Sequence, residues 1–153
     1  MDYSKVKFFK FMYQGSLVSN FVEVELKKAK FGTWDLVIKE SKRPIIGNRG
    51  DFIKKTISDK QVQEFLDKVK LIDFDVWNEW LATRESSMLD GVRWGLTISN
   101  GMVLTKNKIE VAGSGASFPL YFDWFCSLLV DLGATSLKGS QFERNPYWEP
   151  HLY

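Results

Sequence analysis

The fold of this chain is constrained most by short segments in which apolar and polar residues alternate. Val22, Val24 and Leu26 are separated by charged residues, and the same period of two returns at 34–38 and at 92–98. Such a period places every second side chain on one face of a strand, so each segment predicts a strand with one face on a core and the other in water. The chain is therefore expected to build a sheet that is covered on one side.

Further strands are expected around these three. The apolar residues of 6–13 predict a first strand with a bulge at Phe8-Phe9, where the alternation slips. Residues 34–38 are expected to pair antiparallel with 22–26, and 52–57 predicts another short strand. Asn100-Gly101 is the strongest hairpin signal, and it connects 92–98 to strands at 102–104 and 109–111.

Two segments predict helices. Ser58 and Gln61 form a capping box, after which the apolar residues follow at i, i+3, i+4 and i+7. A second helix is expected from Pro119 to Leu132, because Pro suits a first turn and Gly133 suits the position after a helix end. Residues 72–90 show no clean period.

The two halves of the chain share a pattern. W-x-L-x-I occurs at 34–38 and again at 94–98, an offset of 60, and the core positions of the two predicted helices keep that offset. We interpret this as two strand–strand–helix halves whose helices pack on one face of a single antiparallel sheet, an α+β fold. Any strand alternates in this way, so a chance likeness is the alternative explanation.

Length and composition set further limits. The 153 residues, 44% of them apolar, suffice for one compact domain, which we place at 1–133. The aromatic tail 134–153 is expected to dock back on this domain and bury Tyr147 and Trp148, or else to dock on another chain. The start of the chain does not resemble a signal peptide and no window is long enough to span a bilayer, so a soluble, cytoplasmic protein is expected.

Catalytic chemistry has few candidates. The chain has one Cys, Cys126, whose apolar neighbours predict a buried side chain, and one His, His151, near its end. Nucleophilic triads and His-ligated metals are therefore not expected, and the sequence predicts no catalytic residue, cofactor or metal site. We accordingly expect a protein that is not an enzyme.

The segment 73–90 is the best candidate for a contact surface. It holds five acidic residues against Arg84, a net charge of −4, with tryptophans between them. Trp is a preferred hot-spot residue at interfaces, and an acidic face imitates nucleic acid toward a basic nuclease. We therefore predict a protein-binding protein, most plausibly an immunity-type inhibitor that occludes a cognate bacterial toxin domain. The predicted partner-binding residues are Asp73, Asp75, Trp77, Glu79 and Trp80.

Two other functions stay open. Residues 1–60 hold 13 Lys or Arg and 7 Asp or Glu, a net of +6. A basic loop at 39–55 is the basis for a nucleic-acid-binding module. Its candidate residues are Lys42, Arg43, Arg49, Lys54 and Lys55. The third function is a carboxylate-metal enzyme that uses Asp73, Asp75 and Glu79.

One part of the chain resembles a known group. Residues 90–98 carry D-G-x-x-W-x-L-x-I, and residues 113–119 read Gly-Ser-Gly-Ala-Ser-Phe-Pro before an apolar helix. In these motifs the chain resembles small bacterial proteins of unknown function, which carry G-S-x-A-Y-P or a similar run. Here Gly115 stands where Asn is expected, and residues 106–108 lengthen the hairpin. The resemblance implies a bacterial, cytoplasmic protein and assigns no active residue.

Overall fold

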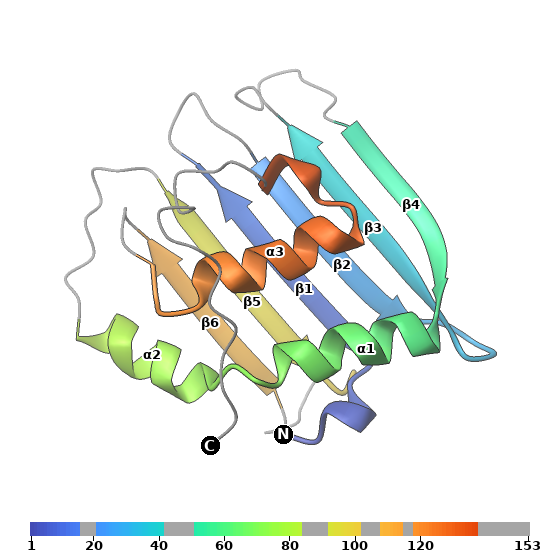
Figure 1. Cartoon of the computed structure of the whole chain (residues 1–153), viewed down its shortest axis with the longest axis horizontal. Coiled ribbons are helices and arrows are strands. Elements are labelled where there is room, and N and C mark those ends of the chain that lie inside the picture. Colours follow the sequence, from blue (N-terminus) through green and yellow to red (C-terminus); the bar gives the residue numbers. More distant parts are fainter. Residues whose placement is uncertain (16–20, 42–50, 84–91, 102–107, 115–117, 138–153) are drawn as a thin grey trace.

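A computed structural model shows a six-stranded antiparallel sheet with helices on one face (Figure 1). It describes residues 1–15, 21–41, 51–83, 92–101, 108–114 and 118–137. The strands are β1 (Phe8–Gln14), β2 (Phe21–Lys28), β3 (Thr33–Ser41), β4 (Asp51–Ser58), β5 (Arg93–Ser99) and β6 (Lys108–Ser114). The helices are α1 (Asp59–Val69), α2 (Phe74–Ala82) and α3 (Phe122–Leu132), with short 3-10 helices η1 (Tyr3–Lys5) and η2 (Thr135–Leu137). The predicted α+β class is confirmed.

The sheet has the order β4-β3-β2-β1-β5-β6, and one of its faces forms the floor of the core. Buried and less buried residues alternate along β2 as the apolar and charged residues do in the sequence. Val22, Val24 and Leu26 are buried, while Glu23 and Glu25 between them point to the other side. We call that other side the open face, because α1, α2 and α3 all lie on the core side (Figure 1). The one-sided cover expected from the period of two is confirmed.

The sheet has an internal two-fold arrangement. From either edge, the first strand leads into a helix (β4 into α1, β6 into α3), and the second strand carries a buried tryptophan. The registers agree as well, since Trp34 pairs with Ile57 and Trp94 pairs with Gly113. The expected strand–strand–helix halves are therefore present in the topology and in the positions of the core residues.

Three local expectations need correction. The pairing of β1 is continuous with both neighbours, so there is no bulge at Phe8-Phe9. Val6, which suggested a longer strand, is buried just before β1 begins. The last helix begins at Phe122 and not at Pro119, after Tyr121 with a positive φ of 69°. The third difference is helix α2 (Phe74–Ala82), which lies in the segment 72–90, where the sequence shows no regular spacing of apolar residues.

The end of the described chain packs on the core. Ala134 and Leu137 are buried, and the backbone N–H of Ser136 donates to the Glu40 carboxylate. The remaining tail, with Tyr147 and Trp148, lies outside the described residues, as does the hairpin segment 102–107. Within the described ranges, no helix combines the length and the apolar character needed to cross a membrane.

Candidate functional site

Helix α2 is short and begins with a side-chain cap. The Asp73 carboxylate accepts a hydrogen bond of 3.0 Å from the backbone N–H of Asp75, which satisfies one of the free donors at the helix start. Phe74 and Trp77, three residues apart, turn one side of the helix into the core. Leu81 is partly buried against the core, and Asp75, Val76, Asn78 and Glu79 are exposed.

Trp77 is a core residue, so the prediction that it lies outward is wrong. Its side chain is only 2% exposed, and its indole N–H donates to the Leu120 carbonyl at 2.9 Å. Its ring also meets Trp94 and Phe74 edge to face, with ring centres 5.8 and 5.0 Å apart. Burial of such a large ring, with its N–H satisfied, stabilises the fold, and no partner protein reaches it.

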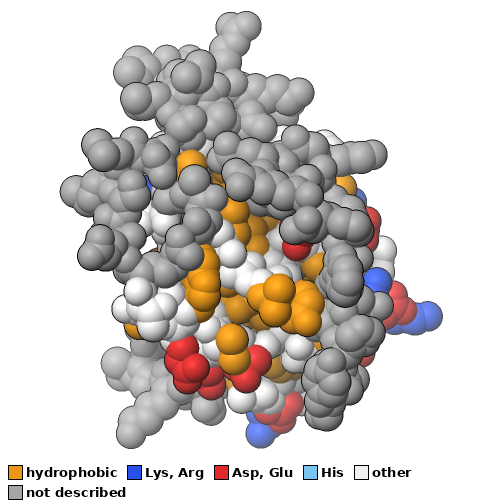
Figure 2. All heavy atoms as spheres, turned by 60° about the vertical axis from the view of Figure 1, so that its left-hand side comes forward, with side chains coloured by type: hydrophobic (Ala, Val, Ile, Leu, Met, Phe, Trp, Pro, Cys, Tyr) orange, Lys and Arg blue, Asp and Glu red, His pale blue; other side chains and the backbone are white. Residues whose placement is uncertain are grey.

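The other four predicted residues do reach the surface. Asp73, Asp75 and Glu79 are exposed, and Trp80 is half-buried. Val76, which the sequence analysis did not single out, is 52% exposed among them. We call these five residues the α2 surface. Figure 2 shows the side of the molecule on which α2 and β6 lie, where hydrophobic side chains gather above acidic ones.

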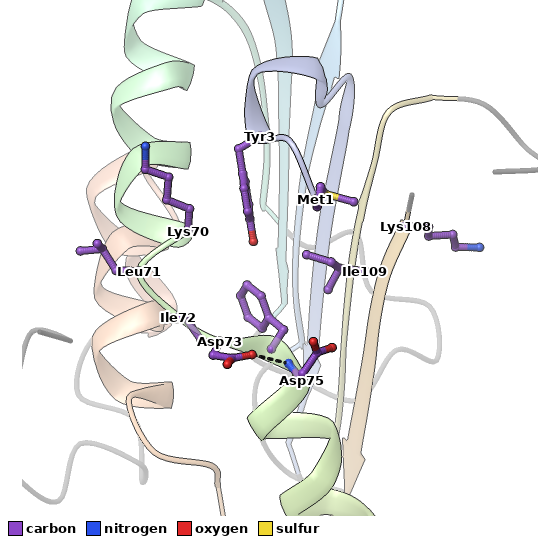
Figure 3. A pocket seen from close by; sticks show the side chains of 10 residues that line it. Met1, Tyr3, Lys70, Leu71, Ile72, Asp73, Asp75, Lys108 and Ile109 are labelled. Carbon is purple, nitrogen blue, oxygen red and sulfur yellow. Dashed lines mark hydrogen bonds between the residues drawn. The ribbon is translucent and has the colours of Figure 1, made fainter. Parts of the chain in front are cut away.

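A cavity of about 500 Å³ opens beside the start of α2. Its lining includes Tyr3, Asp73 and Asp75, with Lys70 and Lys108 at its sides, and we call it the Tyr3 cavity. In Figure 3 the Tyr3 ring extends from η1 with its hydroxyl directed toward the start of α2, while the two lysine side chains extend away from the carboxylates. The cavity therefore presents a phenol and two carboxylates.

The electrostatics of this cavity act on Tyr3. Burial, together with the negative charges of Asp73 and Asp75, raises the pKa of its phenol to about 12, and burial is the larger cause. The hydroxyl is therefore protonated at neutral pH and is available as a donor. No sequence pattern predicts Tyr3 as a site residue, because its position beside α2 depends on a contact between residues seventy positions apart.

The edge of the sheet is linked to α2. The Asn78 amide donates to the Glu110 carbonyl of the edge strand β6 at 3.3 Å. A backbone carbonyl that would otherwise stand unpaired at the edge is thereby satisfied. This contact holds α2 beside β6 and fixes the direction in which the α2 surface points.

The described residues of the two alternative sites do not come together. Among the described residues, no three His, Cys, Asp or Glu side chains lie close enough to hold a metal ion, so Asp73, Asp75 and Glu79 form no such group. Of the basic residues, Lys54 and Lys55 lie on opposite faces of β4, because their partners in β3 are Val37 on the open face and Leu36 on the core face. Lys42, Arg43 and Arg49 lie outside the described residues.

Comparison of the chain with protein-family models, with curated proteins and with solved structures gives no significant match. The resemblance in residues 90–98 and 113–119 to small bacterial proteins stays a prediction. The functional assignment therefore has to come from the geometry of the chain itself.

Proposed function

We propose that this protein binds a basic partner protein through the α2 surface. The proposal rests on the exposure of the carboxylates of this surface and on their lack of ion-pair partners in the described part of the chain. Asp73, Asp75 and Glu79 are exposed within two turns, and none of them has an ion-pair partner among the described residues. Unpaired charges of one sign attract a surface of the opposite sign and accelerate its approach.

The apolar part of the α2 surface supports the same proposal. Val76 is exposed at the centre of the acidic residues, and Trp80 is half-buried beside it. An apolar centre with a charged rim is the usual composition of an interface, and a partly exposed Trp supplies a large contact area. The carboxylates provide the orientation of the complex and the apolar residues contribute to its affinity.

The Tyr3 cavity adds a specific contact to this surface. A Lys or Arg side chain of the partner that enters it meets the carboxylates of Asp73 and Asp75 and the oxygen of Tyr3. A cation that is held by two carboxylates in a partly closed site forms a charge-assisted interaction, which is stronger than one on an open surface. We therefore infer a cationic anchor residue in the partner.

The class of partner that fits these features is a basic toxin domain, with this protein as its immunity-type inhibitor in the cytoplasm. A nuclease carries a basic groove for its substrate, and a helix with three exposed carboxylates at its cap and on its surface covers such a groove by charge complementarity. This assignment rests on the acidic α2 surface and on the small size of the chain.

The test uses the protein as an immobilised bait in an extract of its host, followed by identification and purification of the captured partner. Asp75→Lys combined with Glu79→Lys should weaken the complex by roughly 100-fold, because like charges then face each other across the interface. When the partner is expressed in cells, the wild-type protein should restore growth and the double variant should not.

A matched control carries the same change of charge elsewhere. Glu64→Lys on α1 and Asp131→Lys on α3 alter exposed residues away from the α2 surface, and this variant should bind and protect like the wild type. If the Asp75/Glu79 variant captures the same partner and protects cells equally well at low salt, the α2 surface is not the binding site.

A further inference from the structure

A second cavity, which the proposed function does not use, lies at the end of the sheet. It has a volume of about 470 Å³ and lies at the end of β1 where Phe8 stands. Along one row of the open face, Phe8 pairs with Lys27 on one side and with Ser99 on the other, and Ser99 pairs with Lys108. Lys7, just before β1, and Lys28, at the last position of β2 and opposite the core-facing Trp34, also line the cavity, so four lysines from the end of the sheet border it, and we call this site the lysine cavity.

The charge of the lysine cavity is not neutralised. No Asp or Glu is among its lining residues. Lys108 forms an ion pair with Glu110 at 2.5 Å, whereas Lys7, Lys27 and Lys28 have no ion pair among the described residues. Several ammonium groups around one small space repel each other, and an anion in that space relieves the repulsion.

The backbone holds these lysines in place. The N–H of Lys7 donates to the Ser99 carbonyl, and the N–H of Lys28 donates to the Lys7 carbonyl, both at 2.9 Å. The Lys7 side chain lies over Gly101, where a Cβ atom would come within 3.3 Å of the Lys7 Cβ. Gly101 also has a φ of +86°, which favours glycine. The backbone that carries these lysines is thus fixed before any ligand arrives.

The remaining lining groups suit a planar ring and its polar substituents. The Phe8 ring is partly exposed, and Thr97 and Ser99 place hydroxyls on the same face beside it. The volume lies within the range of small-ligand sites. A base that stacks on Phe8 would leave its phosphate near the lysines.

A second aromatic residue lies at the same end of the sheet. The hairpin that continues from Lys28 carries Lys30 and then Phe31, whose side chain is 98% exposed. Phe31 has a φ of +64°, a left-handed conformation that is costly for a residue with a Cβ atom. Positive charge beside exposed aromatic rings is the composition of surfaces that bind single strands.

We propose that the lysine cavity binds a nucleotide unit, with its phosphate on Lys7, Lys27 and Lys28 and its base on Phe8. The shared chemistry is a phosphate attached to an aromatic base, and its source is either a single-stranded nucleic acid or a free nucleotide. The site is separate from the α2 surface, so this proposal and the proposed function stand or fall independently.

The test measures fluorescence anisotropy of a labelled single-stranded oligonucleotide of about ten nucleotides, as DNA and as RNA, starting at about 50 mM salt. We expect binding that weakens steeply with salt. The variant Lys7→Gln/Lys27→Gln/Lys28→Gln should lower the slope of log affinity against log salt by about 0.7, because the contact with one phosphate of the single strand is lost. Phe8→Leu should weaken binding about tenfold and leave the slope unchanged.

The control variant removes three lysines elsewhere. Lys60, Lys68 and Lys70 are exposed on α1 and at its C-cap, and their change to Gln alters the net charge equally. This variant should bind like the wild type. Displacement of the oligonucleotide by adenosine monophosphate identifies a free nucleotide as the source, and binding without displacement identifies a nucleic acid. Absence of binding at low salt, or an equal loss in the control variant, overturns the proposal.

Discussion

At the scale of single residues, the packing of Trp94 limits which residue can stand at Gly113, its partner across β5 and β6. The indole of Trp94 lies directly over Gly113: a Cβ atom built there would meet its Cε2 atom at 2.3 Å. The equivalent residue opposite Trp34 is Ile57, so the two halves of the sheet fill the same position differently. Glycine is required at 113 because the ring occupies the space of a side chain.

Gly113→Ala should therefore lower the free energy of unfolding by about 2 kcal/mol or more, since the buried Trp94 ring has little room to move. Gly95→Ala is the control, because a Cβ atom there meets only the Val111 carbonyl oxygen, at 3.8 Å. It should change stability by less than about 1 kcal/mol. Denaturant unfolding measures both values, and Trp94→Phe should restore part of the loss in the Gly113 variant; equal effects of the two glycine changes would contradict the clash.

Tyr3 is the second residue whose environment leads to a prediction. Its pKa is raised to about 12 in the folded protein, whereas an exposed tyrosine ionises near pH 10. The folded state therefore holds this proton more tightly than the unfolded state does. The resulting stability is fully present below about pH 10 and is lost as the pH rises toward 12.

The difference in absorbance between the wild type and Tyr3→Phe should report this ionisation near pH 12. Asp75→Asn should lower the pKa, because one of the two negative charges that disfavour the phenolate is removed. Tryptophan fluorescence recorded on the same samples shows whether the chain is still folded. A difference spectrum that titrates near pH 10 in the folded wild type would show that the Tyr3 phenol is not buried beside the carboxylates.

At the scale of elements, α1 shows how a local sequence determines a helix start. The Ser58 hydroxyl accepts from the Gln61 N–H, and the Gln61 side chain accepts from the Ser58 N–H, both at 3.2 Å. The next residue, Asp59, accepts from the buried indole of Trp34 at 2.9 Å. The cap thus sets where α1 begins, and the contact with Trp34 attaches that start to β3.

Ser58→Ala should cost about 1 kcal/mol of stability, because the Gln61 N–H loses its acceptor at the helix start. Ser58→Asp should retain most of the stability, since a carboxylate accepts the same hydrogen bond and is favoured near a helix N-terminus. Thermal unfolding followed by circular dichroism compares the variants. A loss of the same size in Ser58→Asp would mean that the capping box is not the stabilising feature.

Helix α2 shows the opposite case. Only Phe74 and Trp77 of its nine residues are buried, so its apolar period is too short to distinguish from irregular sequence. Asp is a residue type that caps helices, but no long amphipathic segment follows Asp73. The helix owes its position to contacts made by the core and the sheet edge, including those of Trp77 with Leu120 and of Asn78 with Glu110.

At the scale of the whole molecule, a cluster of aromatic rings joins the three helices to the sheet. Phe125 of α3 lies against Phe9 and Phe11 of β1 and also against Phe74 and Trp77 of α2. Phe9 in turn meets Phe65 of α1 edge to face, with ring centres 5.1 Å apart. The abundance of aromatic residues is therefore explained mainly by a core that all the layers share.

The two candidate sites lie at different places on this framework. The α2 surface is on a helix that lies beside the edge strand β6, and the lysine cavity is at the end of the sheet where β1 begins. Lys108, the first residue of β6, lines both the Tyr3 cavity and the lysine cavity. The acidic and basic surfaces thus approach each other at one end of β6.

What the sequence determined by itself is the set of elements with a clear period or cap. The alternation of 22–26, 34–38 and 92–98 predicted the strands and their buried faces, and Ser58 with Gln61 predicted the first helix. These features depend on neighbours within a few residues, so they can be recognised without knowledge of the fold. The offset of 60 between the halves also predicted that both helices cover the same face.

What only the tertiary structure decided is which distant side chains meet. Trp77 is buried because Leu120, Trp94 and Phe125 surround it, and nothing within its own segment distinguishes it from the half-buried Trp80. Tyr3 joins Asp73 and Asp75, and Lys7 joins Lys28 and Lys108, because strand order brings these segments to one end of the sheet. Burial and charge at a site are summed over all of its neighbours, and those neighbours come from parts of the chain that only the fold brings together.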